Sequence, residues 1–163
     1  MRSTVPSSEP EVSLTKVTNL FVDAAFINQL GVRELATEEG ICTAQVELPA
    51  WMGKPQQSLH AVVQASLADH AARSAVKSVV APDTSVVRLD FKLRYLETAT
   101  GRTVRAVANV LRCSRSIAVV EVDIYSQGAQ AGVEVLVAVA EVTLVVEDDS
   151  VQFPETHCAC LEI

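Results

Sequence analysis

The sequence has no long hydrophobic run and no basic cluster, and these absences exclude the first classes of protein. None of its 163 residues belongs to an apolar stretch approaching the roughly 20 residues that span a bilayer. With 13 Lys and Arg against 20 Asp and Glu, the net charge is -7. That balance argues against nucleic acid or an anionic membrane surface as the main partner. Because the first ten residues also lack the charged and apolar blocks of a signal peptide, we predict a cytoplasmic protein.

Cysteine is scarce as well. Four cysteines do not make a disulfide framework in a chain of this size. Cys42 and Cys113 stand in strand-like segments, where we expect small core residues. The stretch His157-Cys158-Ala159-Cys160 contains soft metal ligands, but no CxxC or HxxxH pair elsewhere completes a zinc site. We therefore expect no bound metal.

Glycine and proline are absent between Ser58 and Val80, and this stretch predicts the only long helix. Ser58 is a good N-cap, and Pro82 prevents the helix from continuing. A helix of about 22 residues is roughly 33 Å long, enough to cross a sheet. Apolar side chains return at steps of three and four residues: Leu59, Val62, Val63, Leu67, Ala71, Ala75 and Val79.

Alternating apolar and polar residues predict strands on both sides of this helix. Before it, residues 32–37 and 41–48 flank a turn at Glu38-Glu39-Gly40. In the first strand after it, we expect Arg88, Asp90, Lys92 and Arg94 to face solvent and the intervening apolar residues to face the core. Short links between successive strands predict antiparallel neighbours. The four strands after the helix are predicted at residues 85–95, 102–113, 115–125 and 133–146.

These elements predict one α+β domain over residues 17–147, between a flexible leader at 1–16 and a tail at 148–163. A short amphipathic helix is predicted at residues 18–30, ended by Gly31. The long helix must bury its apolar face, and the sheet offers the available surface. We therefore predict a curved six-stranded antiparallel sheet wrapped around the long helix.

This order of elements resembles the hotdog fold, and the residues resemble its acyl-CoA thioesterases of the phenylacetate-degradation and 4-hydroxybenzoyl-CoA type. The resemblance runs from about Phe21 to Val146. It rests on short motifs in a fixed order: Leu30-Gly31-Val32, Gly40, Leu48-Pro49, Leu59-His60, Leu67-Ala68-Asp69, Phe91-Lys92-Leu93-Arg94-Tyr95-Leu96, Gly101, Arg112 and residues 115–122.

The resemblance implies a catalytic role for Asp69, which stands nine positions after His60, as in the family's motif. Asp69 would attack the thioester carbonyl or activate a water for that attack. The backbone N–H of Ala61 would stabilise the oxyanion at the positive end of the helix. Gln56 or Gln57 would supply the side-chain amide that commonly assists. Apart from the resemblance, Asp69 is typical of a solvated helix residue, and His60 of one that shapes the helix entrance by hydrogen bonding.

The sequence departs from the family pattern at two places. Ala61-Val62 replaces the usual Gly-Gly, and Arg73 stands four positions past Asp69, where relatives often carry Ser or Thr. For the CoA phosphates, cations on the strands are candidates, although such residues also form ordinary solvated faces. The three candidate cations are Lys92, Arg112 and Arg115.

Helix geometry predicts that His60 and Asp69 do not meet within one chain. Nine residues separate them by roughly 12 to 14 Å and by about half a revolution. A working site therefore needs the helix entrance of one subunit and Asp69 of another. The resemblance likewise implies homodimers or dimers of dimers, with no cofactor beyond the CoA of the substrate.

Two other functions stay open at this point. A non-catalytic protein that binds acyl-CoA or an acyl carrier fits the loss of the glycine pair. A hotdog hydratase or dehydratase usually pairs an Asp or Glu with a His, often as Asp, four residues, then His. Here Asp23 is followed at that spacing by Asn28, so the imidazole is missing.

Overall fold

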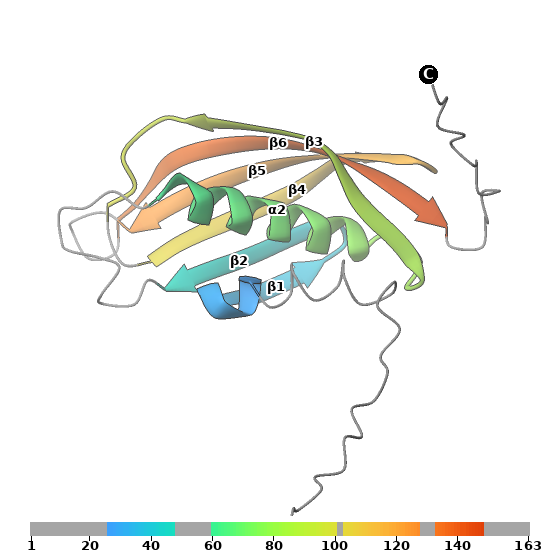
Figure 1. The fold of residues 1–163 in the computed structure, drawn as a ribbon, viewed down its shortest axis with the longest axis horizontal. Coiled ribbons are helices and arrows are strands. Elements are labelled where there is room, and N and C mark those ends of the chain that lie inside the picture. Colours follow the sequence, from blue (N-terminus) through green and yellow to red (C-terminus); the bar gives the residue numbers. More distant parts are fainter. Residues whose placement is uncertain (1–25, 48–59, 101–102, 128–132, 149–163) are drawn as a thin grey trace, which may run out of the picture.

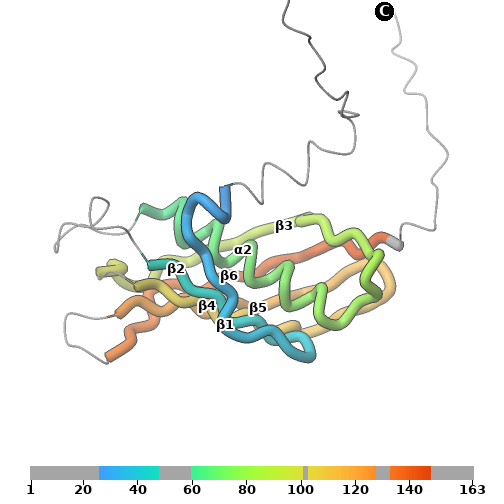
Figure 2. The backbone as a smooth tube through the Cα atoms, turned by 90° about the horizontal axis from the view of Figure 1, so that it is seen from below, coloured from blue at the N-terminus to red at the C-terminus, as the bar shows by residue number. Residues whose placement is uncertain are grey.

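The structure, a computed structural model, describes residues 26–47, 60–100, 103–127 and 133–148. In these ranges α2 lies across one face of a curved sheet, as Figure 1 shows, and Figure 2 shows the same layers from below. Residues 26–30 are helical, which confirms the described part of the predicted first helix. The other elements are β1 (Val32–Glu38), β2 (Ile41–Glu47), α2 (Ala61–Lys77), β3 (Thr84–Tyr95), β4 (Thr103–Cys113), β5 (Ile117–Gln127) and β6 (Glu134–Asp148).

The six strands form one antiparallel sheet in the order β1-β2-β4-β5-β6-β3, so the predicted hotdog architecture is confirmed. The predicted pairing of β3 with β4 is wrong, because β3 pairs with β6 at the far edge. The link from β3 to β4 therefore crosses the end of the sheet. Three strand spacings amount to roughly 14 Å, which a short extended link can span. The N–H groups of Leu96 and Glu97 both donate to the carbonyl of Val137, at 2.9 and 3.1 Å, and fix the start of this link.

The long helix is shorter at both ends than predicted. It begins at Ala61 with His60 as N-cap, whose Nδ1 accepts a hydrogen bond from the Val62 N–H at 3.2 Å. The predicted cap, Ser58, lies outside the described residues. At the other end the helix stops at Lys77 because the Ser78 hydroxyl donates to the Ala75 carbonyl at 2.7 Å and accepts from the Gly40 N–H at 2.8 Å. Ser78 thereby ties the end of α2 to the β1–β2 turn.

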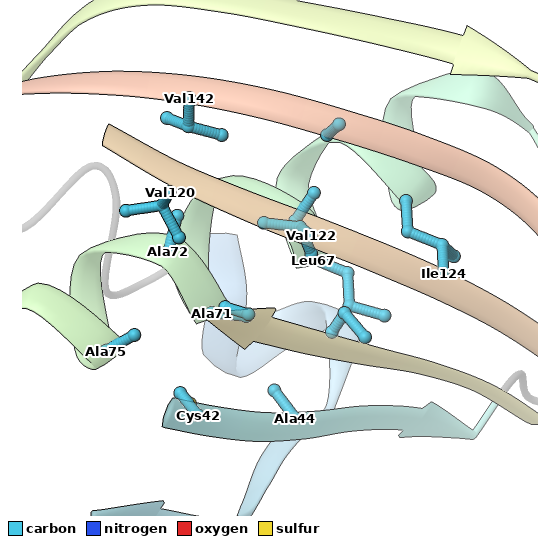
Figure 3. Packing of buried hydrophobic residues seen from close by; sticks show 14 of the residues in the cluster. Cys42, Ala44, Leu67, Ala71, Ala72, Ala75, Val120, Val122, Ile124 and Val142 are labelled. Carbon is cyan, nitrogen blue, oxygen red and sulfur yellow. The ribbon is translucent and has the colours of Figure 1, made fainter. Parts of the chain in front are cut away.

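The core lies between α2 and the concave face of the sheet, and small residues dominate it (Figure 3). The buried side of α2 is largely alanine, which lets the helix backbone lie close to the strands. Leu67 is its largest fully buried side chain. Facing α2 are Cys42, Ala44, Val120, Val122, Ile124 and Val142.

Truncation of Leu67 tests this packing. Leu67 is 0% exposed, so Leu67→Ala is expected to lower the free energy of unfolding by about 2–5 kcal/mol through lost burial and the cavity left behind. The control is Val62→Ala on the same helix, because Val62 is 51% exposed. Urea unfolding followed by circular dichroism measures both. Equal losses for the two variants would contradict the assigned core.

A bulge in β3 changes which side chains face the helix. The register shifts between Arg88 and Asp90, so Arg88 pairs with the buried Leu144 while Lys92 pairs with the exposed Glu141. Arg88 therefore lies on the helix side of the sheet and not, as was predicted, on the face of its charged neighbours, although its side chain is still 51% exposed. The predicted burial is also wrong for three apolar residues of this edge strand, which are exposed: Val87, Leu89 and Tyr95.

The two cysteines within the described ranges differ. Cys42 is fully buried, as predicted, and burial raises the pKa of its thiol, so it stays protonated at neutral pH. Cys113 is exposed, so its predicted place in the core is wrong. The reason is that β2 pairs with β4 only as far as Asn109. Beyond Val110, whose N–H donates to the Gly40 carbonyl at 2.9 Å, β4 has no pairing strand on that side among the described residues.

Candidate functional site

The N-terminus of α2 opens onto a hollow of about 620 Å³. Ala61 is the first helical residue, and its N–H has no hydrogen-bond partner within the described residues. It is a free donor at the positive end of the helix, where a developing negative charge is stabilised. His60 holds the helix start in place as its N-cap, which confirms the structural role expected of it. The hollow is lined by His60, Ala61, Gln64, Tyr95, Leu96, Glu97, Thr98 and Ala99.

Gln64 is a polar residue of this hollow that the sequence analysis missed. It lies one turn after His60, is 3% exposed, and its Oε1 has no hydrogen-bond partner in the described part of the chain. A buried amide without a partner is costly, so it marks a place where a ligand can supply one. The signal in the sequence was its position: Gln64 follows His60 by four residues and so shares a helix face with it.

A second hollow, of about 470 Å³, surrounds Asp69. Asp69 is the only carboxylate on α2 and is 7% exposed, so it is not a solvated helix residue. No residue lines both hollows, which places His60 and Asp69 on different sides of the helix, as predicted. The second hollow is lined by Phe26, Ile27, Val62, Ala65, Ser66, Asp69, Arg73, Arg88 and Phe91.

Two arginines offset the charge of the Asp69 carboxylate. Arg73, one turn further along α2, donates from Nη2 to Oδ2 at 2.8 Å. Arg88 reaches across from β3, with Nη1 at 3.0 Å from Oδ1. That second contact is an ion pair by distance, but its direction is poor for a hydrogen bond, and Oδ1 has no hydrogen-bond donor within the described residues. Asp69 is thus a buried, ion-paired carboxylate with one oxygen still able to accept a hydrogen bond.

Ala61 and Val62, which replace the family's Gly-Gly pair, line different hollows. Ala61 lines the hollow at the helix N-terminus, whereas Val62 lines the hollow around Asp69. The Val62 side chain therefore does not crowd the free N–H of Ala61 within its own chain. Gln56 and Gln57 lie outside the described residues.

The predicted phosphate-binding cations lie away from both hollows. Lys92 is exposed and pairs across the sheet with Glu141. Arg112 and Arg115 are exposed at the end of β4 and in the following turn. None of the three lines a hollow, and their role in CoA binding stays a prediction.

A polar cluster outside both hollows joins β1 to α2. Glu34 accepts from Ser74 at 2.6 Å and from Thr37 at 3.1 Å, and its Oε1 lies 2.9 Å from His70 Nε2. Burial alone would raise the pKa of Glu34, but these hydrogen bonds and the nearby His70 lower it below its ordinary value. Ser74 and His70 contact the same carboxylate oxygen rather than each other, so this is not a nucleophile-base arrangement. The cluster fastens the edge strand to the helix.

Comparison with known proteins agrees with the fold. Residues 56–133 match the model of the thioesterase superfamily. The chain is similar to a thioesterase family protein from Silicibacter pomeroyi, at 22% identity over 78% of this chain and 92% of that one, with a TM-score of 0.70. It is also similar to a thioesterase from Haemophilus influenzae (24% identity, 81% and 86% covered, TM-score 0.64). A mutant of the phenylacetic acid degradation protein PaaI from Thermus thermophilus is likewise similar (24%, 74% and 97%, 0.62).

The fold is therefore that of the hotdog proteins, and the resemblance to hotdog-fold thioesterases is confirmed. No curated protein matches the sequence. Within the described residues, no helix is both long enough and apolar enough to cross a membrane.

Proposed function

We propose that this protein hydrolyses acyl-CoA thioesters to a free acid and CoA. The observation that carries the proposal is the burial of Asp69, the only carboxylate on α2, in a hollow of about 470 Å³. Burying a carboxylate in an alanine-rich helix costs free energy of folding. Ionisable groups in such environments cluster at functional sites. The superfamily match over residues 56–133, which contain the α2 residues of both hollows, supports thioester chemistry as the function of this site.

In this proposal Asp69 is the catalytic carboxylate. Its Oδ1, which accepts no hydrogen bond from the described residues, either attacks the thioester carbonyl or takes a proton from an attacking water. Either route places negative charge on the carbonyl oxygen. The free N–H of Ala61, at the end of a helix of 17 residues, is the proposed oxyanion donor. Gln56 or Gln57 remains the proposed assisting amide.

The two parts of this site come from different subunits of a proposed homodimer. Ala61 and Asp69 line separate hollows on α2, so one thioester cannot reach both within one chain. No strand of the described residues pairs with the outer edge of β3, which carries exposed Val87 and Leu89. A free, apolar strand edge is a ready site for a second copy. Docking there would bring each α2 towards the partner's helix.

The test is release of CoA from short, long and aromatic acyl-CoAs, followed by free thiol. We expect turnover of at least one substrate well above a blank without enzyme, with dependence on enzyme concentration. Size-exclusion chromatography with light scattering should give twice the mass of the chain, 17.5 kDa, or a multiple of that dimer. A monomer that hydrolyses no member of the panel would overturn the proposal.

A second candidate is a non-catalytic acyl-CoA binding protein. The observation that favours it is the pairing of both Asp69 oxygens with arginines, which offsets the charge that a nucleophile needs. Calorimetric titration separates the two functions. Binding of an acyl-CoA that is recovered intact supports the second candidate, and its conversion to CoA supports the first.

A further inference from the structure

Arg88 has more hydrogen-bond donors than the described residues use. A guanidinium carries five N–H groups. In the structure its Nη1 forms the ion pair with Asp69, and its centre lies 5.9 Å from the centre of the Phe91 ring. The side chain is 51% exposed and lines the hollow around Asp69. The remaining N–H groups are therefore available to a ligand at the mouth of that hollow.

The described lining of this hollow combines an apolar wall with arginine side chains. Its described charged residues are Asp69 and the two arginines that contact it, Arg73 and Arg88, in a protein whose net charge is -7. Its described apolar members are Phe26, Ile27, Val62, Ala65 and Phe91. An apolar chain that ends in an anion matches both parts. Guanidinium groups pair with carboxylates through two parallel hydrogen bonds, which gives direction as well as attraction.

We propose that the acyl group accepted by this hollow ends in a carboxylate, which Arg88 binds. The proposal rests on the proposed function, since it names the substrate class for the same site. The methylene chain packs against the apolar wall, and the terminal carboxylate takes the free N–H groups of Arg88. Arg88 thereby determines acyl specificity in addition to its ion pair with Asp69, so its role is judged by the ratio of two substrates rather than by the rate of either.

The first experiment compares adipoyl-CoA with hexanoyl-CoA, which have the same chain length and differ in the terminal carboxylate. Hydrogen bonds to charged groups correspond to a preference of about 10- to 100-fold in kcat/KM for adipoyl-CoA. Blanks without enzyme correct for spontaneous hydrolysis. Equal rates, or a preference for hexanoyl-CoA, would overturn the specificity proposal while leaving thioester hydrolysis in place.

Variants at two residues of β3 test whether Arg88 causes the preference for adipoyl-CoA. Arg88→Gln should bring the adipoyl-to-hexanoyl ratio close to one. Arg94→Gln is the matched control, because Arg94 is exposed on the same strand, lines neither hollow and loses the same charge. It should keep the full preference. A ratio unchanged by Arg88→Gln, or lowered equally by both variants, would overturn the assignment.

A third comparison separates an acyl carboxylate from the CoA phosphates, which are also anions. Adipoyl and hexanoyl thioesters of N-acetylcysteamine lack those phosphates. We expect the preference for the adipoyl group to persist with them, and its disappearance would contradict the proposal. If no thioester is hydrolysed, the proposed function fails, and calorimetric affinities for adipoyl-CoA and hexanoyl-CoA still decide the binding preference.

Discussion

Replacement of Asp69 by Asn should lower kcat for acyl-CoA hydrolysis by about 100-fold or more, the usual contribution of a general base. Asn keeps the shape of the side chain but can neither attack the carbonyl nor take a proton from water. The loss should fall on kcat rather than on KM, because the carboxylate acts on the reacting carbon and not on the CoA moiety. Steady-state thiol release over a range of substrate concentrations up to saturation measures both constants.

Asp90→Asn is the matched control, since Asp90 is an exposed carboxylate on β3. Asp69→Asn also leaves Arg73 and Arg88 without the charge between them, which lowers stability. Circular dichroism and thermal unfolding therefore have to show that the variant is folded at the assay temperature. A folded Asp69→Asn protein with the activity of Asp90→Asn would remove Asp69 from the mechanism.

The helix and its carboxylate could be predicted because they depend on local sequence. A stretch without Gly or Pro, with apolar residues at helical spacing, predicts α2, and the structure places it at Ala61–Lys77. Asp69 stood out as the lone acid in that stretch, but its burial, at 7% exposed, is known only from the structure. The half-turn between His60 and Asp69 also follows from helical geometry alone.

The face of the sheet on which Arg88 lies could not be predicted, because alternation along a strand assumes an unbroken period of two. The bulge between Arg88 and Asp90 interrupts that period and turns Arg88 towards Asp69. Nothing in the alternation of residues 85–95 reveals the extra residue. Residues next to bulges are therefore where sequence reasoning assigned the wrong face, and here that residue carries the proposed specificity.

The order of the strands in the sheet could not be predicted from the sequence either. Short links favour neighbours in the sheet, yet β3 pairs with β6, which is distant in sequence. The pairing depends on which strand edge is free once β4, β5 and β6 have formed, a property of the whole sheet. This crossing link also forms part of the hollow at the helix N-terminus, through Leu96 to Ala99. Its residues could not be assigned to a site without the topology.

Ala61→Pro should lower kcat by about 100- to 1000-fold, the usual cost of removing one oxyanion donor. Ala61 is the first helical residue, where proline is tolerated because its N–H has no helical partner. His60 has φ -61° and ψ 135°, an extended conformation that suits a residue before proline. The substitution thus deletes the proposed donor and leaves the helix intact. Ala61→Gly, which keeps the N–H, is the control and should retain activity.

Mixing the two inactive variants tests whether the site spans two subunits. In a dimer of one Ala61→Pro chain and one Asp69→Asn chain, one site carries both substitutions and the other carries neither. An equal mixture that exchanges freely contains about one half such heterodimers, each with one of its two sites intact, so activity should return to about a quarter of wild type. Separate solutions of either variant should stay near one hundredth or below. If instead each chain held its own complete site, mixing could not reunite an intact Ala61 with an intact Asp69, and the mixture would be no more active than its components.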